Sequence, residues 1–441
     1  MGAREGTRMS QRIAVVGSGI AGLATAWWLS QRHAVTLFEA DARLGGHTHT
    51  HAVQMAGREY AVDTGFIVFN PQNYPLLSGL FESLDVASQP TTMSFSVHNE
   101  TDGLEYNATS LDTLFCQRRN LLSPRFWGLL RDLKRFYREA PALLDGDDAG
   151  PTLGEYLQAN RYGAAFRDLH LVPMASALWS SPSAGILEFP ARYLVQFMTN
   201  HHMLQLTGRP EWRVVRGGSS RYIDALRARW SVTERVGCPV DAVRRDAAGV
   251  HVASAAGSER FDQIVLACHS DQALALLDDA DGAERDILGA IRYQTNETVL
   301  HTDARLLPRD RKAWAAWNAH VPATPDGACT VSYCMHQLQS LDTPEPLVVT
   351  LNRSDAIDPA KVIARMRYAH PVFDAAMVAA QGRREEIQGQ RRTWYAGAYW
   401  GWGFHEDGIR SAAQVARAFD LGPLAAGGRA QSTPMPVSAV A

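Results

Sequence analysis

Apolar residues run without interruption from Ile13 to Val16, and a second mainly apolar stretch from Ala34 to Phe38 contains one polar residue, Thr36. Continuous apolar runs of this length are typical of parallel strands that are covered on both faces. Between them a glycine-rich turn leads into the stretch "AGLATAWWL", which is suited to a helix. The pattern predicts a strand, a tight turn, a helix and a second strand, which is the opening unit of a doubly wound α/β fold.

A long internal stretch, from Pro90 to Pro210, has mainly the pattern of helices. Ser123 is suited to cap a helix whose first residue is Pro124, and a second helix signal begins at Thr152. The polar stretch 145–150 is the expected linker between these helices.

The chain returns to β-type patterns further on. Short β runs follow Val236 and are interrupted by a turn at residues 247–249, and residues 262–268 have the pattern of a buried strand. Residues 291–392 mix strand-like runs such as "PLVVTLN" with polar turns. The internal stretches therefore predict a part of the protein that contains both helices and strands.

Composition restricts the function classes. The 441 residues, 46% hydrophobic and 20% charged, are enough for two or three domains with a large core. A net charge of −3 argues against a duplex nucleic-acid partner. Five cysteines without a CxxC pair fit a reducing compartment and give no zinc framework. Since no signal-peptide pattern and no run of 18 apolar residues is visible, we expect a cytoplasmic protein.

The first turn carries a GxGxxG motif formed by Gly17, Gly19 and Gly22. In such a motif the first glycine permits a tight turn, the second lets the backbone approach a pyrophosphate, and the third lets helix and strand pack closely. The helix N-terminus offers unpaired N–H groups to the phosphates. Glu39 ends the second strand, 22 residues after Gly17, where a carboxylate can accept hydrogen bonds from a ribose. The unit predicts a Rossmann-type dinucleotide-binding domain, whereas a turn used only for packing would leave Glu39 unexplained.

Three histidines, His47, His49 and His51, alternate after this unit. If they lie on a strand, neighbours share a face about 6.6 Å apart and the outer pair is about 13 Å apart. One zinc, with ligand distances of about 2.1 Å, cannot then bind all three, although two neighbours could join ligands from elsewhere. Because they follow the dinucleotide-binding unit, we expect a cofactor-pocket or structural role and no catalytic metal.

The stretch "EADARLGG" joins Glu39 to Arg43 and to the doublet Gly45-Gly46. It resembles the flavin-containing amine oxidase and phytoene desaturase superfamily, in which the arginine and the glycines lie along the FAD pyrophosphate and the approach to the flavin. The resemblance implies that the cofactor is FAD. The family usually has Arg after the doublet, and the residue here is His47, which we expect near the pyrophosphate. The stretch "VDTGFIVFN" resembles the next family element, whose backbone passes the isoalloxazine ring at residues 65–67.

Two later segments resemble the rest of the FAD-binding domain. Residues 213–229 are similar to the glycine pair and helix by which the chain returns from the substrate domain, and a main-chain pair near Val240 is expected to hold the adenine. Residues 393–419 resemble the C-terminal flavin motif, with a helix expected to open at Gly408-Ile409. Ala398 stands where many relatives have an acidic residue, and acids follow only at residues 406 and 407. The expected FAD-binding residues are Gly17, Gly19, Ile20, Ala21, Gly22, Glu39, Ala40, Arg43, Gly45, Gly46, His47, Gly65, Phe66, Ile67, Val240, Gly397, Ala398, Gly408 and Ile409.

The resemblance covers the start, the middle and the end of the chain, about half of it. It implies a discontinuous FAD-binding domain of residues 10–90, 211–290 and 391–425, and an inserted α+β substrate domain of residues 91–210 and 291–390. Residues 426–441 are expected to form a C-terminal tail.

Two enzymatic functions share this fold. Most amine oxidases of the superfamily carry a lysine that holds a water near flavin N5, but no lysine lies between Lys134 and Lys312. The segment that should hold it, "LGAIRYQTNETVLHTD", offers Asn296 and Glu297. The stretch "GFHEDG" is similar to a bacterial subfamily of predicted FAD/NAD-binding proteins linked to modification of fatty acyl chains. We therefore expect an enzyme that transfers hydride to flavin N5 while desaturating or isomerising an acyl chain, with oxidation of a small amine as the alternative.

The stretch from Ala175 to Leu206 is rich in Leu, Phe, Met and Trp. It predicts an apolar substrate tunnel beginning at Trp179, with ordinary core as the alternative for most of its side chains. A neutral histidine near the reacting carbons could exchange a proton at neutral pH. The expected catalytic residues are His201, His202, Asn200, Tyr399 and Trp400, the last two as a wall at the flavin.

The expected partners follow from these inferences. They are a hydrophobic small molecule or acyl lipid, a peripheral contact with a membrane, and oxygen or an unknown protein as electron acceptor. Direct hydride exchange with NAD(P)H is not indicated, because no second GxGxxG unit is present. A flavin-binding protein without turnover is a further alternative, disfavoured because a buried FAD site beside a large inserted domain usually indicates a substrate pocket.

Overall fold

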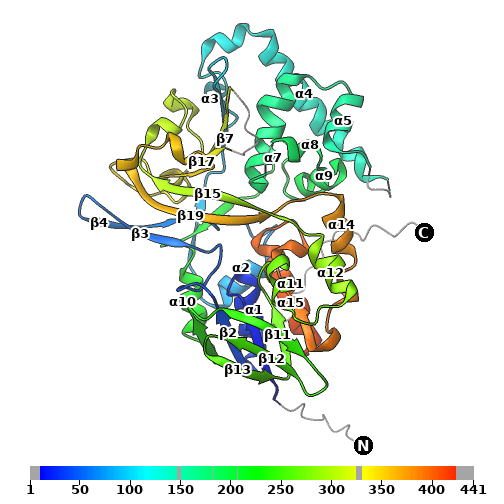
Figure 1. The fold of residues 1–441 in the computed structure, drawn as a ribbon. Coiled ribbons are helices and arrows are strands. Elements are labelled where there is room, and N and C mark those ends of the chain that lie inside the picture. The colour runs from blue at the N-terminus through cyan, green and yellow to red at the C-terminus, as the bar shows by residue number, and fades with distance from the viewer. Residues whose placement is uncertain (1–9, 147–149, 182, 206, 324–329, 424–441) are drawn as a thin grey trace, which may run out of the picture.

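The computed structural model describes residues 10–146, 150–181, 183–205, 207–323 and 330–423 (Figure 1). The first unit forms as predicted, with strand β1 (Arg12–Val16), helix α1 (Ile20–Leu29) and strand β2 (Ala34–Glu39). Strand β1 pairs in parallel with β2 on one side and with β14 (Gln263–Leu266) on the other. Strands β10 (Val232–Val236) and β20 (Thr393–Tyr395) complete a parallel five-stranded sheet of order β10-β2-β1-β14-β20. The expected Rossmann-type sheet is confirmed.

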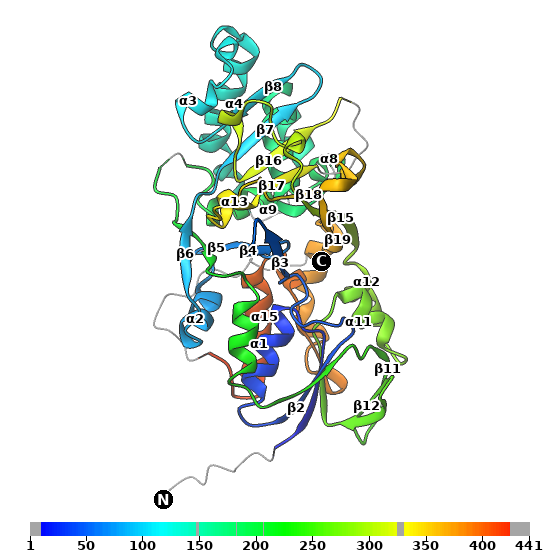
Figure 2. The same cartoon turned by 90° about the vertical axis from the view of Figure 1, so that its left-hand side faces the viewer.

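Helices α1 and α15 (His405–Ala418) pack against one another beside this sheet (Figure 2). Two glycines, Gly22 and Gly408, allow α1 to pack closely against the glycine loop and against α15. A Cβ at Gly22 would lie 1.9 Å from the carbonyl oxygen of Gly17, and a Cβ at Gly408 would lie 2.7 Å from Cγ2 of Ile20. The C-terminal segment is thereby fixed against the start of α1.

A seven-stranded sheet lies at the other end of the molecule, in the order β19-β15-β18-β17-β16-β7-β8 (Figure 1). Its strands come from two separate parts of the chain: β7 (Phe95–Asn99), β8 (Leu104–Asn107), β15 (Tyr293–His301), β16 (Trp317–Val321), β17 (Val331–Cys334), β18 (Val348–Leu351) and β19 (Val362–Pro371). Helices accompany this sheet: α3 (Leu111–Leu114), α4 (Pro124–Glu139), α5 (Leu153–Ala159), α7 (Val172–Trp179), α8 (Ser183–Leu187) and α9 (Ala191–Asn200).

The two predicted helix starts in this region are confirmed. The Ser123 side chain accepts a hydrogen bond of 3.2 Å from the backbone N–H of Phe126, and Pro124 is the first residue of α4. At α5, Thr152 and Glu155 bond reciprocally to each other's backbone N–H groups. These caps satisfy N–H groups that the first turn of a helix leaves without partners.

Three small sheets complete the architecture. They are the hairpin β3 (Thr50–Met55) and β4 (Arg58–Asp63), the sheet of β5 (Val68–Phe69), β9 (Trp212–Val215) and β6 (Ser88–Thr91), and the sheet of β11 (Val240–Arg245), β12 (Val250–Ser254) and β13 (Gly257–Phe261). The distribution of strands suits the proposed domain limits, which remain a proposal. The expected tail at 426–441 lies outside the described residues.

Two local predictions are wrong. Helix α15 begins at His405 rather than at Gly408, because the Asp407 side chain accepts a hydrogen bond of 3.1 Å from the backbone N–H of Phe404 and so caps the helix earlier. Strand β3 begins at Thr50, so His51 lies on a strand and His47 and His49 precede it. In the described residues, no helix combines the length and the apolar character needed to cross a membrane.

Candidate FAD and substrate site

The glycine loop after β1 leaves open space in front of α1. Gly17 has a φ of +98°, and a Cβ there would lie 2.9 Å from the backbone nitrogen of Cys268. Gly19 is the N-cap of α1, and no side chain caps the helix at this end. A Cβ at Gly19 would meet no atom of the described protein within 4 Å. A helix N-terminus with uncapped N–H groups and free space before it is suited to a pyrophosphate.

Glu39 is held beside this loop. Its carboxylate accepts hydrogen bonds from the backbone N–H and the hydroxyl of Ser18, at 2.9 and 2.5 Å, and from the backbone N–H of Asp41 at 2.8 Å. These bonds fix the carboxylate at the end of β2 before any ligand binds, and Ala40 beside it is exposed. The geometry matches the expected role of Glu39 toward a ribose.

The Arg43 segment packs directly on the glycine loop. The Arg43 guanidinium donates to the carbonyl oxygens of Thr48 and Gly46, at 3.0 and 2.8 Å. The backbone nitrogen of Gly45 donates to the carbonyl oxygen of Ser18 at 3.0 Å. Gly46 has a φ of +56°, and a Cβ there would lie 3.1 Å from the Cα of Gly19. Arg43 therefore shapes the turn that brings the glycine doublet against the glycine loop.

His47 lies between this turn and the loop at residues 65–67. Its carbonyl oxygen accepts a hydrogen bond of 2.8 Å from the backbone nitrogen of Phe66, and a Cβ at Gly65 would lie 2.0 Å from the same oxygen. The His47 ring is 5.2 Å from that of His370 and 6.0 Å from that of His269, measured between centroids. Its Nε2 is enclosed and has no hydrogen-bond partner among the described residues. Such an enclosed polar atom is suited to a ligand.

Four histidines from distant parts of the chain belong to this region: His47, His269, His370 and His405, called here the inner histidines. The His405 ring stacks on Phe66 with centroids 3.7 Å apart, and its Nε2 lies 3.0 Å from the hydroxyl of Thr48. Burial lowers the pKa of each ring, to about 4 for His370 and about 3 for His405. All four rings are therefore neutral at neutral pH.

The sequence reasoning missed His269, His370 and His405 as site residues. They follow β14, lie on β19 and begin α15, and no local motif connects these places. The described residues contain no group of three His, Cys, Asp or Glu side chains arranged to hold a metal ion. The rings of His49 and His51 lie only 4.0 Å apart, closer than the spacing expected for a strand.

The C-terminal motif completes the wall next to α1. The backbone nitrogen of Gly397 donates to the hydroxyl of Ser411 at 2.9 Å, which ties the end of β20 to α15. The position of a Cβ on Gly408 is 3.8 Å from Cβ of Ala398 and close to Ile20. Ile409 is buried in the core that α1 and α15 share. Val240 begins β11 and is partly buried.

Tyr399 and Trp400 are packed away from the expected catalytic histidines. Tyr399 is buried, and a Cβ at Gly397 would overlap its ring at 2.2 Å. The Trp400 indole donates to the carbonyl oxygen of Tyr395 at 3.1 Å, and the Arg384 guanidinium lies 5.6 Å from the centre of its ring. Neither residue lines the cavity described next.

A cavity of about 290 Å³ lies between the end of α9 and the start of α15. The His201 ring stacks on Phe197 with centroids 3.9 Å apart, and its Nδ1 lies 3.0 Å from the Phe197 carbonyl oxygen. Burial lowers the pKa of His201 to about 4 and raises that of Glu406 to about 7. The structure thus brings three of the five expected catalytic residues into one cavity. It is lined by Asn73, Tyr74, Thr199, Asn200, His201, His202, Trp402, Phe404, Glu406, Asp407 and Arg410.

The expected tunnel is mostly core. The Trp179 ring packs against those of Phe189 and Phe197 at 5.0 and 4.7 Å, and its indole donates to the carbonyl oxygen of Trp402. From residue 179 on, only residues 199–202 of the stretch line the cavity, and Leu206 lies outside the described residues. The apolar side chains described here pack in the core, which was the alternative interpretation of this stretch.

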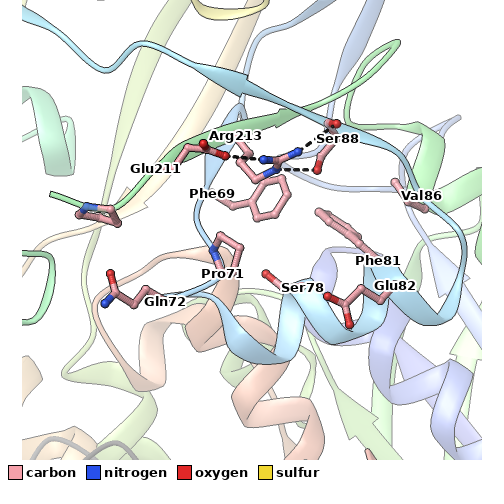
Figure 3. A pocket seen from close by; sticks show the side chains of 11 residues that line it. Phe69, Pro71, Gln72, Ser78, Phe81, Glu82, Val86, Ser88, Glu211 and Arg213 are labelled. Carbon is pink, nitrogen blue, oxygen red and sulfur yellow. Dashed lines mark hydrogen bonds and ion pairs between the residues drawn. The ribbon is translucent and has the colours of Figure 1, made fainter. Parts of the chain in front are cut away.

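A second cavity, of about 670 Å³, lies beside α2 (Pro75–Ser83) and the small sheet of β5, β9 and β6 (Figure 3). Arg213 donates to the hydroxyl of Ser88 at 2.9 Å and pairs with Glu211 at 2.5 Å. The sequence reasoning did not identify this cavity, because its walls come from two separate parts of the chain. It is lined by Phe69, Pro71, Gln72, Ser78, Phe81, Glu82, Val86, Ser88, Pro210, Glu211 and Arg213.

Solved structures share the fold of this chain. A protein named as a protoporphyrinogen oxidase from Exiguobacterium sp. 255-15 is 19% identical, with a TM-score of 0.66 over 94% of this chain and 99% of that one. The CLA-producing fatty acid isomerase from P. acnes is 18% identical, with a TM-score of 0.62 over 93% and 99%. Cyclohexylamine oxidase from Brevibacterium oxydans IH-35A is 17% identical, with a TM-score of 0.63 over 93% and 100%.

The residues present fit FAD. Gly19 faces open space, hydrogen bonds hold the Glu39 carboxylate at the end of β2, and Nε2 of His47 has no hydrogen-bond partner among the described residues. A family model, described as flavin containing amine oxidoreductase, matches residues 20–301, nearly two thirds of the chain. The chain therefore belongs to the flavin containing amine oxidoreductase family, is an FAD-dependent oxidoreductase, and has the amine oxidase-like fold of that family.

Proposed function

We propose that this enzyme removes hydrogen from a C–H bond of a long apolar chain, most directly a fatty acyl group, and so desaturates or isomerises it. The observation that carries the proposal is the set of four neutral inner histidines beside the glycine doublet. Because the four rings are neutral, they add no net charge near the cofactor. A site without net charge is suited to an uncharged acyl chain.

Two of the three lysines of this chain lie on the surface, and the third, Lys361, ends a short turn before β19. Lys134 is exposed on α4, and Lys312 pairs with Asp112 at 3.0 Å on the surface. At the segment where relatives are expected to carry the site lysine, Asn296 is buried and its amide lies 2.8 Å from Nδ1 of His370. An amide that bonds to an imidazole does not hold a water in the way that a lysine does.

FAD, when bound, supplies the acceptor of a hydride. The chain's own residues orient and protect the reacting bond. Glu39 and the N-terminus of α1 bind the adenosine and pyrophosphate, and Phe66, stacked on His405, excludes water from the neighbouring space. A dry site in which the reacting atoms are held close together is what removal of an unactivated hydrogen requires.

His201 is the proposed proton acceptor. A carbonyl oxygen can only accept, so Nδ1 of His201 carries the proton that is donated to Phe197. Nε2 is then the basic nitrogen of the ring, and the low pKa keeps it unprotonated at neutral pH. Asn200 and His202 line the same cavity and are proposed to position the substrate.

The second cavity supports an extended apolar substrate. Its volume of about 670 Å³ falls within the range of ligand sites, and Phe69, Phe81 and Val86 give it apolar walls. Asn73 and Tyr74 of the first cavity directly follow Pro71 and Gln72 of the second, so both cavities border one loop. The fatty acid isomerase that shares this fold makes an acyl substrate a reasonable choice.

Oxidation of a small amine is the second candidate. Glu406 and Asp407 line the cavity that holds His201, and carboxylates there would attract an ammonium group. Arg410, which bonds to Asp407 at 2.8 Å, offsets part of that charge. The electron acceptor under either function is proposed to be oxygen or a partner protein.

The test follows products by mass spectrometry after incubating FAD-loaded enzyme with long-chain monounsaturated acyl substrates. Desaturation lowers the product mass by two hydrogens, and isomerisation moves a double bond at constant mass. His201→Ala should lower the rate about 100-fold, the usual contribution of a general base, and His202→Ala should lower it less. His251→Ala, on β12 and away from both cavities, is the control. Wild-type rates in both His201→Ala and His202→Ala would remove the proposed roles.

A further inference from the structure

Large apolar side chains are exposed mainly at one place on the described surface. Leu111, Leu121, Leu122 and Trp127 are exposed by 76%, 45%, 88% and 49%, and elsewhere in the described residues only Val236 and Ile363 are comparable. We call the four residues the apolar tip. Clustered exposure of this kind is unusual for a soluble protein surface and marks an interaction site.

Local contacts bring the segments that carry these residues together. The Trp127 indole donates a hydrogen bond of 2.9 Å to the carbonyl oxygen of Leu121, and the ring packs 5.5 Å from that of Phe115. Phe115 is joined to Leu111 by the hydrogen bond that ends α3. On α4 the neighbouring Phe126 and Leu129 are buried in the core, so Trp127 faces outward on a helix that already has its own core face.

The surroundings of the apolar tip are basic. Between residues 111 and 139 the chain has seven basic residues and three acidic ones, a local net charge of +4 in a chain whose total is −3. The acidic residues are Asp112, Asp132 and Glu139, and Asp102, outside this stretch, pairs with Arg125. The basic residues are Arg118, Arg119, Arg125, Arg131, Lys134, Arg135 and Arg138.

We propose that the apolar tip docks on the surface of an anionic lipid bilayer. Leucine and tryptophan enter the interfacial region of a bilayer, while arginines around them bind the negative headgroups. Helices α3 and α4 lie at the end of the molecule opposite the five-stranded sheet, where a flat surface can reach them (Figures 1 and 2). A second copy of the chain is a poorer partner, because a symmetric contact would bring two basic patches together.

The experiment is co-sedimentation of the FAD-loaded enzyme with vesicles of phosphatidylcholine alone and of phosphatidylcholine mixed with phosphatidylglycerol. Binding should need the anionic lipid and should weaken in high salt, which screens the arginines. Leu122→Glu should lower the bound fraction about tenfold, because it removes an inserting side chain and adds a repelled charge. Ile363→Glu, the same type of change at an exposed position on β19, should bind as the wild type does.

Retained FAD and an unchanged melting temperature show that the variants are folded. The proposal is overturned if the wild type does not sediment with anionic vesicles, or if Leu122→Glu and Ile363→Glu bind equally. It is also overturned if light scattering shows a dimer that Leu122→Glu dissociates, since the tip then serves self-association. Vesicle binding needs no turnover, so its outcome is independent of the proposed substrate.

Discussion

Substitution of Gly19 by alanine separates cofactor binding from folding. Gly19 has φ −62° and ψ 174°, a conformation that alanine adopts without strain, and its Cβ would meet no described atom within 4 Å. Alanine is a poorer N-cap than glycine by about 0.5–1 kcal/mol, and the reduced freedom of the unfolded chain offsets about as much. The free energy of unfolding of the FAD-free protein should therefore change by less than about 0.5 kcal/mol.

The added methyl group points into the space proposed for the pyrophosphate. Overpacking of a close contact by one methyl group costs about 1–3 kcal/mol, which weakens FAD binding by about 5- to 150-fold. The assay combines urea unfolding of FAD-free protein with titration of FAD by fluorescence. Gly128→Ala, on α4 and also facing open space, is the matched control and should leave FAD affinity unchanged. If Gly19→Ala binds FAD within twofold of the wild type, the pyrophosphate does not pass over Gly19.

Three further predictions follow from the same site. Glu39→Ala should weaken FAD retention by about 1.5–3 kcal/mol, because hydrogen bonds to a charged group are lost. Cofactor released from the wild type by heat should chromatograph as FAD, and release of FMN or NAD would contradict the cofactor assignment. Burial raises the pKa of Glu406 from 4.5 to about 7, so the folded state holds the carboxyl proton more tightly than the unfolded chain does. The protonated carboxyl therefore contributes its full share of stability below pH 4.5, and this share is lost as the pH rises to about 7. Glu406→Gln should therefore gain about 2–3 kcal/mol relative to the wild type across that window in urea unfolding, and parallel pH profiles would refute the assignment. Elemental analysis of dialysed, active enzyme should show no stoichiometric zinc, iron or copper, whereas a metal that resists chelators and is needed for activity would overturn this expectation.

The glycine loop and its flanking strand and helix could be predicted from the sequence because they are built from one short segment. Local backbone geometry requires glycine at 17 and 22, the GxGxxG spacing places Gly19 between them, and Glu39 ends the very next strand. The spacing of the glycines and the position of Glu39 can both be recognised in the sequence without knowledge of the tertiary structure. The same holds for the caps at Ser123 and Thr152, whose partners lie three residues away.

The inner histidines could not be predicted, because tertiary packing alone brings His269, His370 and His405 toward His47. The extent of a substrate tunnel could not be predicted for a different reason. Apolar residues such as Trp179 and Phe197 have the same sequence pattern whether they line a cavity or pack in a core. The start of α15 was open to prediction, because acidic residues at 406 and 407 are typical of a first helical turn. The resemblance to relatives with a helix opening at Gly408 outweighed that local signal.

The proposed function requires that hydride leaves an acyl chain and not an amine. The most direct test records the visible spectrum of oxidised, FAD-loaded enzyme without oxygen while long-chain unsaturated acyl compounds, or primary and secondary amines, are added. We expect acyl compounds to bleach or shift the flavin absorbance and amines to leave it unchanged. Bleaching by amines together with no response to any acyl chain would contradict it, and the enzyme would then be an amine oxidase.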